Sequence, residues 1–173
     1  MKPKKFVVDT EPLIIMLLII WCSNENRVTD EYMKKIDEKF SQMRIKEERE
    51  ILYKSITSII KNIVVTPHVL AETYDIVETK YDMKGNRGEE FWMFMKDFFK
   101  KIGEECIGKE EILNEKMFVK CGFADTSVYL AAKKLKNENK GYNWVLISHD
   151  WLLRNLSGKD GFSVYGLEDI IYK

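Results

Sequence analysis

The sequence lacks several features by which common classes of protein are recognised. Its three cysteines are widely spaced and form no Cys-x-x-Cys pair, which is typical of a reducing compartment and not of a disulfide framework. Because only two histidines accompany them, the chain offers few of the ligands that zinc prefers, and we expect no zinc site. Glycine-rich loops of the GxxxxGK[ST] or GxGxxG type are missing, so the sequence does not support a nucleotide-cofactor enzyme.

The sequence also has no excess of one charge and no long apolar run. Basic and acidic residues number 28 each, which excludes a uniformly basic coat for nucleic acid but leaves room for a local basic patch. The longest apolar run, Leu13 to Cys22, has ten residues, whereas a membrane-spanning helix needs about 20. The residues that follow this run do not resemble a signal-peptide cleavage site. We therefore expect a cytoplasmic protein without a membrane partner.

Short β-branched runs alternate with helical patterns along the chain. Runs at residues 5–9, 63–66, 144–148 and 162–165 predict four strands. Strands that are nearly all apolar and alternate with helices indicate a parallel sheet covered on both faces. The predicted fold is therefore a three-layer α/β/α sandwich. Since 173 residues are too few for two ordinary domains, we expect a single domain over residues 1–173.

The segment between the first two predicted strands is unusually rich in charge. Sixteen of the thirty residues from Glu25 to Lys54 are charged, eight of each sign. Apolar residues recur among them at helical spacing, which predicts amphipathic helices with solvated outer faces. We interpret this segment as a helical insertion at about residues 23–62.

A second unusual segment is the helix predicted over residues 89–102, whose apolar residues occupy two sides. The residues expected to face the core are Phe91, Phe94 and Phe98, and those on the second side are Trp92, Met95 and Phe99. One small sheet can hardly cover both sides of such a helix. We therefore expect a homodimer or larger assembly that buries part of this helix.

Four acidic residues are predicted to lie at one edge of the sheet. Asp9 ends the first strand and Asp150 follows the third, while Glu72 and Asp125 lie near the starts of helices that leave the same edge. Open parallel sheets bind ligands at this edge. Four converging carboxylates would repel each other unless a divalent cation lay among them, and oxygen ligands suit Mg²⁺ or Mn²⁺. Each acid alone could instead be a helix cap or a partner of the helix dipole.

These acids occur in four short motifs that follow one another along the chain. The motifs are Val7-Val8-Asp9-Thr10, Val65-Thr66-Pro67-His68-Val69-Leu70-Ala71-Glu72, Gly122-Phe123-Ala124-Asp125-Thr126-Ser127 and Leu146-Ile147-Ser148-His149-Asp150. In this order and context, over residues 6–165, the series resembles the PIN domain family of metal-dependent ribonucleases. The sequence departs from the family pattern because no further acid follows Asp150 directly, and because the stretch between the first two motifs is long and charged.

The resemblance implies a fold, an activity and a role for each site residue. The fold would be PIN-like, with a short central parallel sheet and extra helices between its first two strands. The activity would be hydrolysis of RNA phosphodiester bonds by an endoribonuclease in which Mg²⁺ or Mn²⁺ activates a water molecule. The implied metal ligands are Asp9, Asp125 and Asp150, Glu72 would be a further catalytic acid that orients water, and Thr10 and Ser148 would position the substrate.

RNA would then be the substrate, and a protein inhibitor or antitoxin is a further candidate partner. Two other functions fit the same residues. If the acids serve only as structural caps, the chain would be a non-catalytic PIN-like RNA-binding or assembly module, and strong Mn²⁺ binding would separate the two. An aspartate-based phosphatase is a weaker alternative, because such enzymes carry a second aspartate where this chain has Glu11.

Overall fold

The structure, a computed structural model, describes residues 2–23, 49–81 and 83–172 of the chain. Five parallel strands within these residues form one sheet in the order β3-β2-β1-β4-β5. The strands are β1 (Lys4–Val8), β2 (Ile63–Val65), β3 (Gly103–Glu104), β4 (Asn143–Ile147) and β5 (Ser163–Tyr165). The four predicted strands are present. The two-residue β3 was not predicted, because it has no apolar run that could have indicated it.

The order of the strands creates a crevice beside β1. The chain passes from β1 to β2 and β3 on one side, then crosses to β4 and β5 on the other. Phe6 of β1 therefore pairs with Ile63 of β2 and with Val145 of β4. Ligands of open parallel sheets bind at the carboxyl ends of the strands where the order reverses. In this chain that point lies between the ends of β1 and β4.

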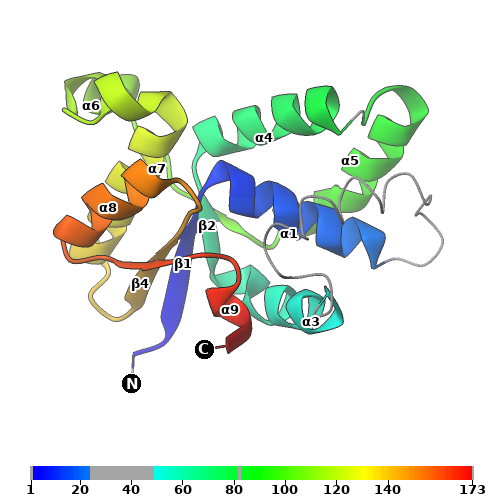
Figure 1. Ribbon diagram of the computed structural model, residues 1–173, viewed down its shortest axis with the longest axis horizontal. Helices are drawn as coiled ribbons and strands as arrows, with labels where there is room; N and C mark the ends of the chain where they lie inside the picture. The colour runs from blue at the N-terminus through cyan, green and yellow to red at the C-terminus, as the bar shows by residue number, and fades with distance from the viewer. Residues whose placement is uncertain (1, 24–48, 82, 173) are drawn as a thin grey trace.

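Helices cover both faces of the sheet (Figure 1). One side carries α1 (Thr10–Cys22), α3 (Arg49–Ile59) and α5 (Gly85–Phe99), and the other carries α7 (Phe118–Glu138) and α8 (Trp151–Lys159). The predicted α/β class and the parallel sheet are therefore confirmed, and the arrangement is that of three layers. Helix α4 (Pro67–Lys80) contacts both α1 and α7.

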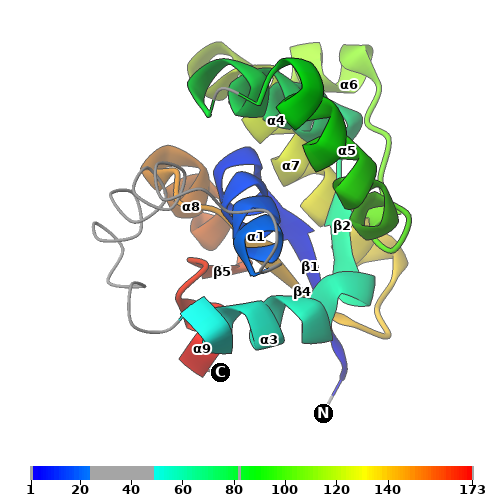
Figure 2. The ribbon, with the colours of Figure 1, turned by 90° about the vertical axis from the view of Figure 1, so that its right-hand side faces the viewer.

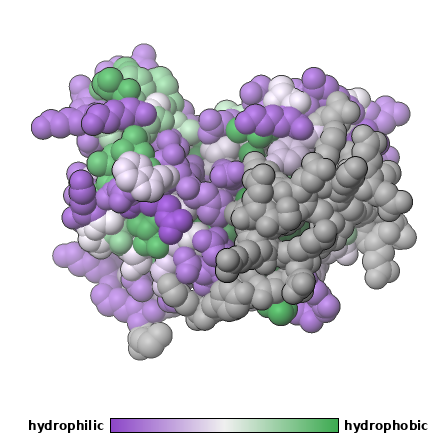
Figure 3. All heavy atoms as spheres, in the orientation of Figure 1, coloured by the Kyte–Doolittle hydropathy of each residue, from purple (hydrophilic) through white to green (hydrophobic). Residues whose placement is uncertain are grey.

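Short elements complete the described fold. The 3-10 turn η1 (Ile60–Asn62) leads into β2, and α6 (Lys109–Asn114) contacts α7. At the end of the chain, α9 (Asp169–Tyr172) packs against α3 (Figure 2). On the face drawn in Figure 3, hydrophilic side chains predominate among the residues that are coloured, and the apolar ones gather mainly on the side of α6, α7 and α8.

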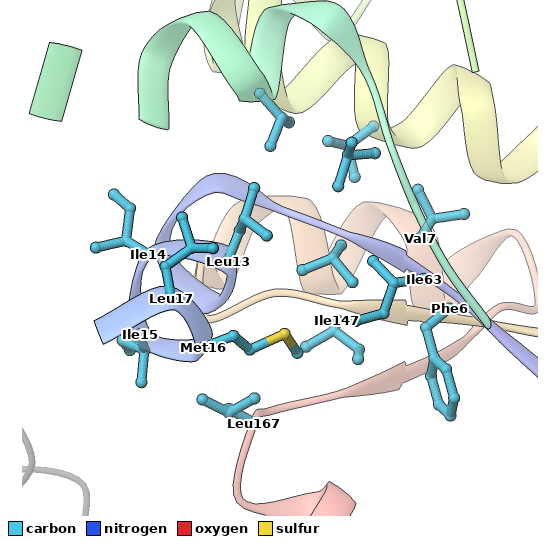
Figure 4. Close-up of a cluster of buried hydrophobic side chains, with 14 of the residues drawn as sticks. Phe6, Val7, Leu13, Ile14, Ile15, Met16, Leu17, Ile63, Ile147 and Leu167 are labelled. Atoms are coloured by element: carbon cyan, nitrogen blue, oxygen red, sulfur yellow. The ribbon is translucent and has the colours of Figure 1, made fainter. Parts of the chain in front are cut away.

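Helix α1 is apolar on all sides because it is covered on all sides. Its residues from Pro12 to Ile19 are all buried, and α3, α4 and α5 contact it. Figure 4 shows Leu13 and Leu17 on one side of the helix and Ile15 on another. A helix that is apolar all round belongs in a core, so this position accounts for the ten-residue apolar run. In the described part of the chain, no helix is both long and apolar enough to cross a membrane.

The expectations for the insertion and for α5 are met in part. Residues 24–48, where amphipathic helices are predicted, lie outside the described residues. Helix α3 is amphipathic as predicted, with Leu52 and Ile56 buried and Ile51 exposed. Helix α5 covers residues 85–99 instead of 89–102. The expectation that Met95 lies on an outer side is wrong, because this side chain is fully buried.

Helix α7 bends at Gly122, just before the predicted acid Asp125. Gly122 has φ 77° and ψ −168° inside the helix, a region that is essentially restricted to glycine. Because of this bend, a new helical segment begins within a few residues of Asp125. The backbone at Gly122 therefore helps to position this acid.

We expect Gly122→Ala to lower the free energy of unfolding by about 1–3 kcal/mol, the usual cost of a side chain held in such a backbone region. A Cβ atom at this position would meet nothing within 4 Å, so the loss would come from the backbone and not from a clash. Urea denaturation measures it. The matched control is Gly141→Ala, where a Cβ atom also meets open space and φ is not positive. Equal stability of the two variants would contradict this account of the bend.

Candidate active site

Asp9 is a buried carboxylate at the end of β1. Only 4% of the residue is exposed, and both of its oxygens accept hydrogen bonds. Oδ1 accepts from the backbone N–H of Thr10 at 2.7 Å, and Oδ2 accepts from Oγ of Ser148 at 2.7 Å. Burial raises the pKa of Asp9 above its ordinary value, while these two hydrogen bonds oppose the shift. Asp9 is also the N-cap of α1.

Ser148 connects Asp9 to the second predicted strand-end acid. The serine is fully buried, and its Oγ accepts a hydrogen bond from the backbone N–H of Asp150 at 3.0 Å. The side chain of Asp150 accepts from the backbone N–H of Leu153 at 2.6 Å and so caps α8. The helix-cap interpretation is therefore correct for Asp9 and Asp150, although it accounts for only one oxygen of each carboxylate.

Glu72 reaches the site from α4. Oγ1 of the buried Thr10 donates a hydrogen bond to its Oε2 at 2.6 Å, and this contact joins residues 62 positions apart. Thr66 places the helix, since its Oγ1 caps α4 by accepting from the backbone N–H of Val69 and lies 2.7 Å from Oγ of Ser127 in α7. Side-chain contacts thus bring together the first turn of α1, the first two turns of α4 and the part of α7 that follows its bend at Gly122.

Asp125 differs from the other three acids because the described residues provide no hydrogen bond to its carboxylate. The residue is half-buried on α7, and it does not cap the helix. Desolvation raises the pKa of Asp125 to about 7, and repulsion from Asp9, Asp150 and Glu72 adds to the shift. The mutual repulsion expected from the sequence is therefore present at this carboxylate.

The four predicted acids lie around one pocket of about 350 Å³. The pocket is lined by Asp9, Thr10, Glu11, Glu72, Ile76, Asp125, His149, Asp150 and Trp151. Of the six predicted site residues only Ser148 is not in its lining, because its hydroxyl group lies behind Asp9 and donates to it. The convergence of the acids at this edge of the sheet is thus as predicted.

Two titratable residues of the pocket were missed by the sequence analysis. Alternation of side chains along the strand predicted over residues 144–148 would turn His149 away from Ser148 and Asp150, and so away from the site. The strand ends at Ile147, so the alternation of sides stops there. The ring of His149 lies with Nδ1 3.7 Å from Oε2 of Glu11, and its Nε2 accepts a hydrogen bond from the backbone N–H of Leu167.

The carboxylate oxygens of the four acids are of the kind that binds a hard divalent cation, although the side chains do not converge on one point. The four carboxylates offer only oxygen, as Mg²⁺ and Mn²⁺ prefer. As the side chains lie, no three His, Cys, Asp or Glu residues of the described segments form a group that could hold a metal ion. Asp125 is uncommitted, and Glu72 and Asp150 each have one oxygen that accepts no bond from the described residues. These three residues are the ones that could move onto a cation.

Comparison with known proteins adds no family or activity to this geometry. No protein-family model matches the chain, and no curated protein is similar to it. Among solved structures, the chain is similar to a domain of a functionally unknown protein from Methanocaldococcus jannaschii DSM 2661, with 20% identity and a TM-score of 0.40 over 94% of this chain and 90% of that one. At this level the likeness supports no argument about fold or function.

We expect Asp125→Asn to stabilise the protein in the absence of metal, and more at pH 8 than at pH 5. The pKa of this carboxyl rises from 3.8 to about 7 on folding, so ionised Asp125 destabilises the folded state. That cost grows as the pH rises through this interval and is constant above it. The asparagine variant removes it. Urea denaturation of both proteins at the two pH values measures the difference.

Asp97→Asn is the matched control. Asp97 is exposed on α5, and its hydrogen bond from Lys100 lowers the pKa of its carboxyl. Its replacement should therefore give no gain in stability at either pH. If Asp125→Asn destabilises the protein at both pH values, Asp125 is a structural cap and the account of its repulsion is wrong.

Proposed function

We propose that this chain is a PIN-like endoribonuclease that depends on Mg²⁺ or Mn²⁺. The observation that carries the proposal is the half-buried carboxylate of Asp125, which receives no hydrogen bond from the described residues, has a pKa raised to about 7 and shares a pocket with three further acids. A structural role does not account for it, because an unpaired buried charge only costs stability. A bound divalent cation would turn this repulsion into binding energy.

The contacts that each acid makes indicate which acids would bind the cation. Asp125 would hold the cation together with the oxygen of Asp150 that accepts no hydrogen bond from the described residues. Asp9 can contribute as well, because a carboxylate oxygen that accepts one hydrogen bond keeps a second lone pair. When bound, the cation would lower the pKa of a coordinated water and stabilise charge on the phosphoryl oxygens.

Thr10 and Ser148 would act as positioning residues. Thr10 holds one oxygen of Glu72 and leaves the other free to orient a water molecule. Ser148 holds Asp9 and the backbone of Asp150 at the same time. Both hydroxyl groups thus fix the direction of the acids, and contact of Thr10 with the substrate phosphate is an additional role that its place in the pocket allows.

The same contacts argue against an aspartate-based phosphatase. A nucleophilic aspartate needs an oxygen that is free to attack phosphorus. Asp9 is almost completely buried, which leaves little of its carboxylate open to phosphorus, and Glu11 stands where such enzymes carry their second aspartate. A non-catalytic module would explain the caps formed by Asp9 and Asp150 but not the position of Asp125. Hydrolysis of RNA, the activity implied by the order of the four motifs, therefore has the better support.

We expect the purified chain to cleave a single-stranded oligoribonucleotide in Mn²⁺ or Mg²⁺ and to stop in EDTA. Asp125→Asn should abolish cleavage while the variant stays folded, because the uncommitted ligand is lost. Mn²⁺ should raise the melting temperature of the wild type, since a ligand that binds only the folded state stabilises it by mass action. The shift should be much smaller in Asp125→Asn. Fluorescence of a labelled substrate and thermal denaturation give the two readouts.

Asp97→Asn, an exposed acid outside the pocket, should keep both the cleavage and the Mn²⁺ shift. An Mn²⁺ shift without cleavage would indicate an RNA-binding or assembly module. Cleavage that continues in EDTA, or that survives in Asp125→Asn, would contradict the metal-dependent mechanism.

A further inference from the structure

The most exposed aromatic ring beside the acidic pocket is Trp151. It follows Asp150 directly as the first residue of α8, and it is 75% exposed. A tryptophan is expensive to leave in water, and such exposure beside a polar pocket is typical of a binding surface. Trp151 lines the acidic pocket and also a second one of about 510 Å³. The Trp151 ring therefore lies between the acidic pocket and this second pocket.

The second pocket carries a cation and an amide on the same helix. Arg154 and Asn155 line it together with Trp151 and Phe162. Trp151 and Arg154 are three residues apart on α8, so their side chains lie on one face of the helix. No carboxylate of the described residues pairs with the Arg154 guanidinium, whereas four carboxylates line the adjoining pocket. A positive charge so placed can receive a phosphate that the acidic pocket alone would repel.

We propose that Trp151, Arg154 and Asn155 form a subsite for one unpaired nucleotide of the RNA, next to the phosphate at the acidic pocket. The base stacks on Trp151, and the guanidinium of Arg154 contacts the neighbouring phosphate. The side-chain nitrogen of Asn155 donates to the carbonyl of Trp151 at 2.8 Å, which leaves its oxygen to accept from the edge of the base. This inference rests on the proposed function and adds to it the residues that bind the nucleotide next to the acidic pocket.

The chemistry of the subsite favours a nucleotide over a protein segment. An aromatic face beside a guanidinium that no carboxylate of the described residues pairs suits a ligand that combines a flat ring with a phosphate, and a nucleotide has both. A peptide occupant would have to pair with β5, the edge strand of three residues whose Val164 borders the pocket, and would leave the Arg154 guanidinium without an anion. A base within a duplex could not stack on Trp151, because both of its faces are already covered.

The test is binding of a labelled single-stranded oligoribonucleotide, measured by anisotropy in an Asp125→Asn background that cannot cleave. Stacking of one base changes affinity by about five-fold or more. We expect Trp151→Ala and Arg154→Ala each to weaken binding by at least this factor, and Trp151→Phe to keep most of the affinity. Duplex RNA of the same sequence should bind more weakly than the single strand.

Two matched controls exclude general effects of charge and of aromatic surface. Lys159→Ala removes a cation from the same helix outside both pockets, and Tyr142→Ala removes an exposed ring beside the amino end of β4. Neither should change the affinity. If Trp151→Ala leaves binding unchanged while Mn²⁺-dependent cleavage holds, the subsite is wrong and the proposed function stands. If the Mn²⁺ shift and cleavage are absent but RNA binds through Trp151, the subsite stands and the proposed metal-dependent activity is wrong. Absence of RNA binding overturns both.

A different observation concerns the outer surface of α5. A groove of about 1050 Å³ runs between α4 and α5. Tyr74, Trp92 and Phe99 form a row of stacked rings along it, with centroids 4.9 Å and 6.1 Å apart, and Met93 beside them is 72% exposed. This apolar strip is the part of the predicted second side that the described residues do not cover.

The charges along α5 indicate what covers it. Glu89 and Lys96 both line the groove and lie seven residues apart, on the same face of the helix. A two-fold axis across the helix between Trp92 and Met93 would place Glu89 of one copy opposite Lys96 of the other. The surface is therefore complementary to itself, and we infer that a second copy of this chain docks on it with the two α5 helices antiparallel.

Sedimentation equilibrium at micromolar concentration should show a dimer. Glu89→Lys would place like charges opposite each other across the axis and should weaken the dimer by about five-fold or more, and adding Lys96→Glu should restore it. Met93→Glu should dissociate it without unfolding, because the side chain is exposed. A monomeric wild type overturns the inference, and so does a dimer whose affinity is unchanged in Glu89→Lys. A dimer lost in Glu89→Lys and not restored by the double variant does so as well.

Discussion

The carboxylate of Asp9 is the contact on which the carboxyl edge of the sheet depends. A buried charge is tolerated only where donors surround it, and the two donors here come from different parts of the fold. Thr10 donates from the first turn of α1, and Ser148 donates from the residue after β4. Because Ser148 also accepts from Asp150, the same contacts place the start of α8. One carboxylate thus holds two adjacent strands and two helices in register.

The acids differ in how far the protein satisfies them, and this difference locates the chemistry. Asp9, Glu72 and Asp150 each receive a donor from the described residues, whereas Asp125 receives none. Desolvation first, and then repulsion from Asp9, Asp150 and Glu72, raise the pKa of Asp125 to about 7, and no donor among the described residues opposes this shift. A fold selected only for stability would have paired or removed this side chain. A strongly raised pKa in a cleft marks a candidate functional site, and under the proposed function Asp125 would be the ligand that the cation gains first.

The sequence was sufficient to predict what depends on local pattern. Strand ends and helix starts are set by apolar runs, capping residues and prolines along the chain. These local signals were enough to predict that the four acids lie at one edge of the sheet. Contacts between distant segments were not predictable, because nothing local indicates that Thr10 would meet Glu72 or that Ser148 would lie behind Asp9. The predicted direction of the His149 side chain was wrong for a related reason. An error of one residue at the end of β4 changes the direction of the next side chain.

The core explains why the acids cannot relieve their repulsion by moving apart. Helix α1 begins at Asp9 and continues as the most buried helix of the described fold, enclosed by the sheet and by α3, α4 and α5. Shifting its first turn would disturb packing along the whole helix, and interiors as dense as this resist such shifts. Asp125 is held in turn by the bend at Gly122 and by the contact between Thr66 and Ser127. With both backbones fixed, only protonation or a cation can lower the energy of the site. A divalent cation, as the proposed function requires, would neutralise several acids at once, whereas each proton neutralises one.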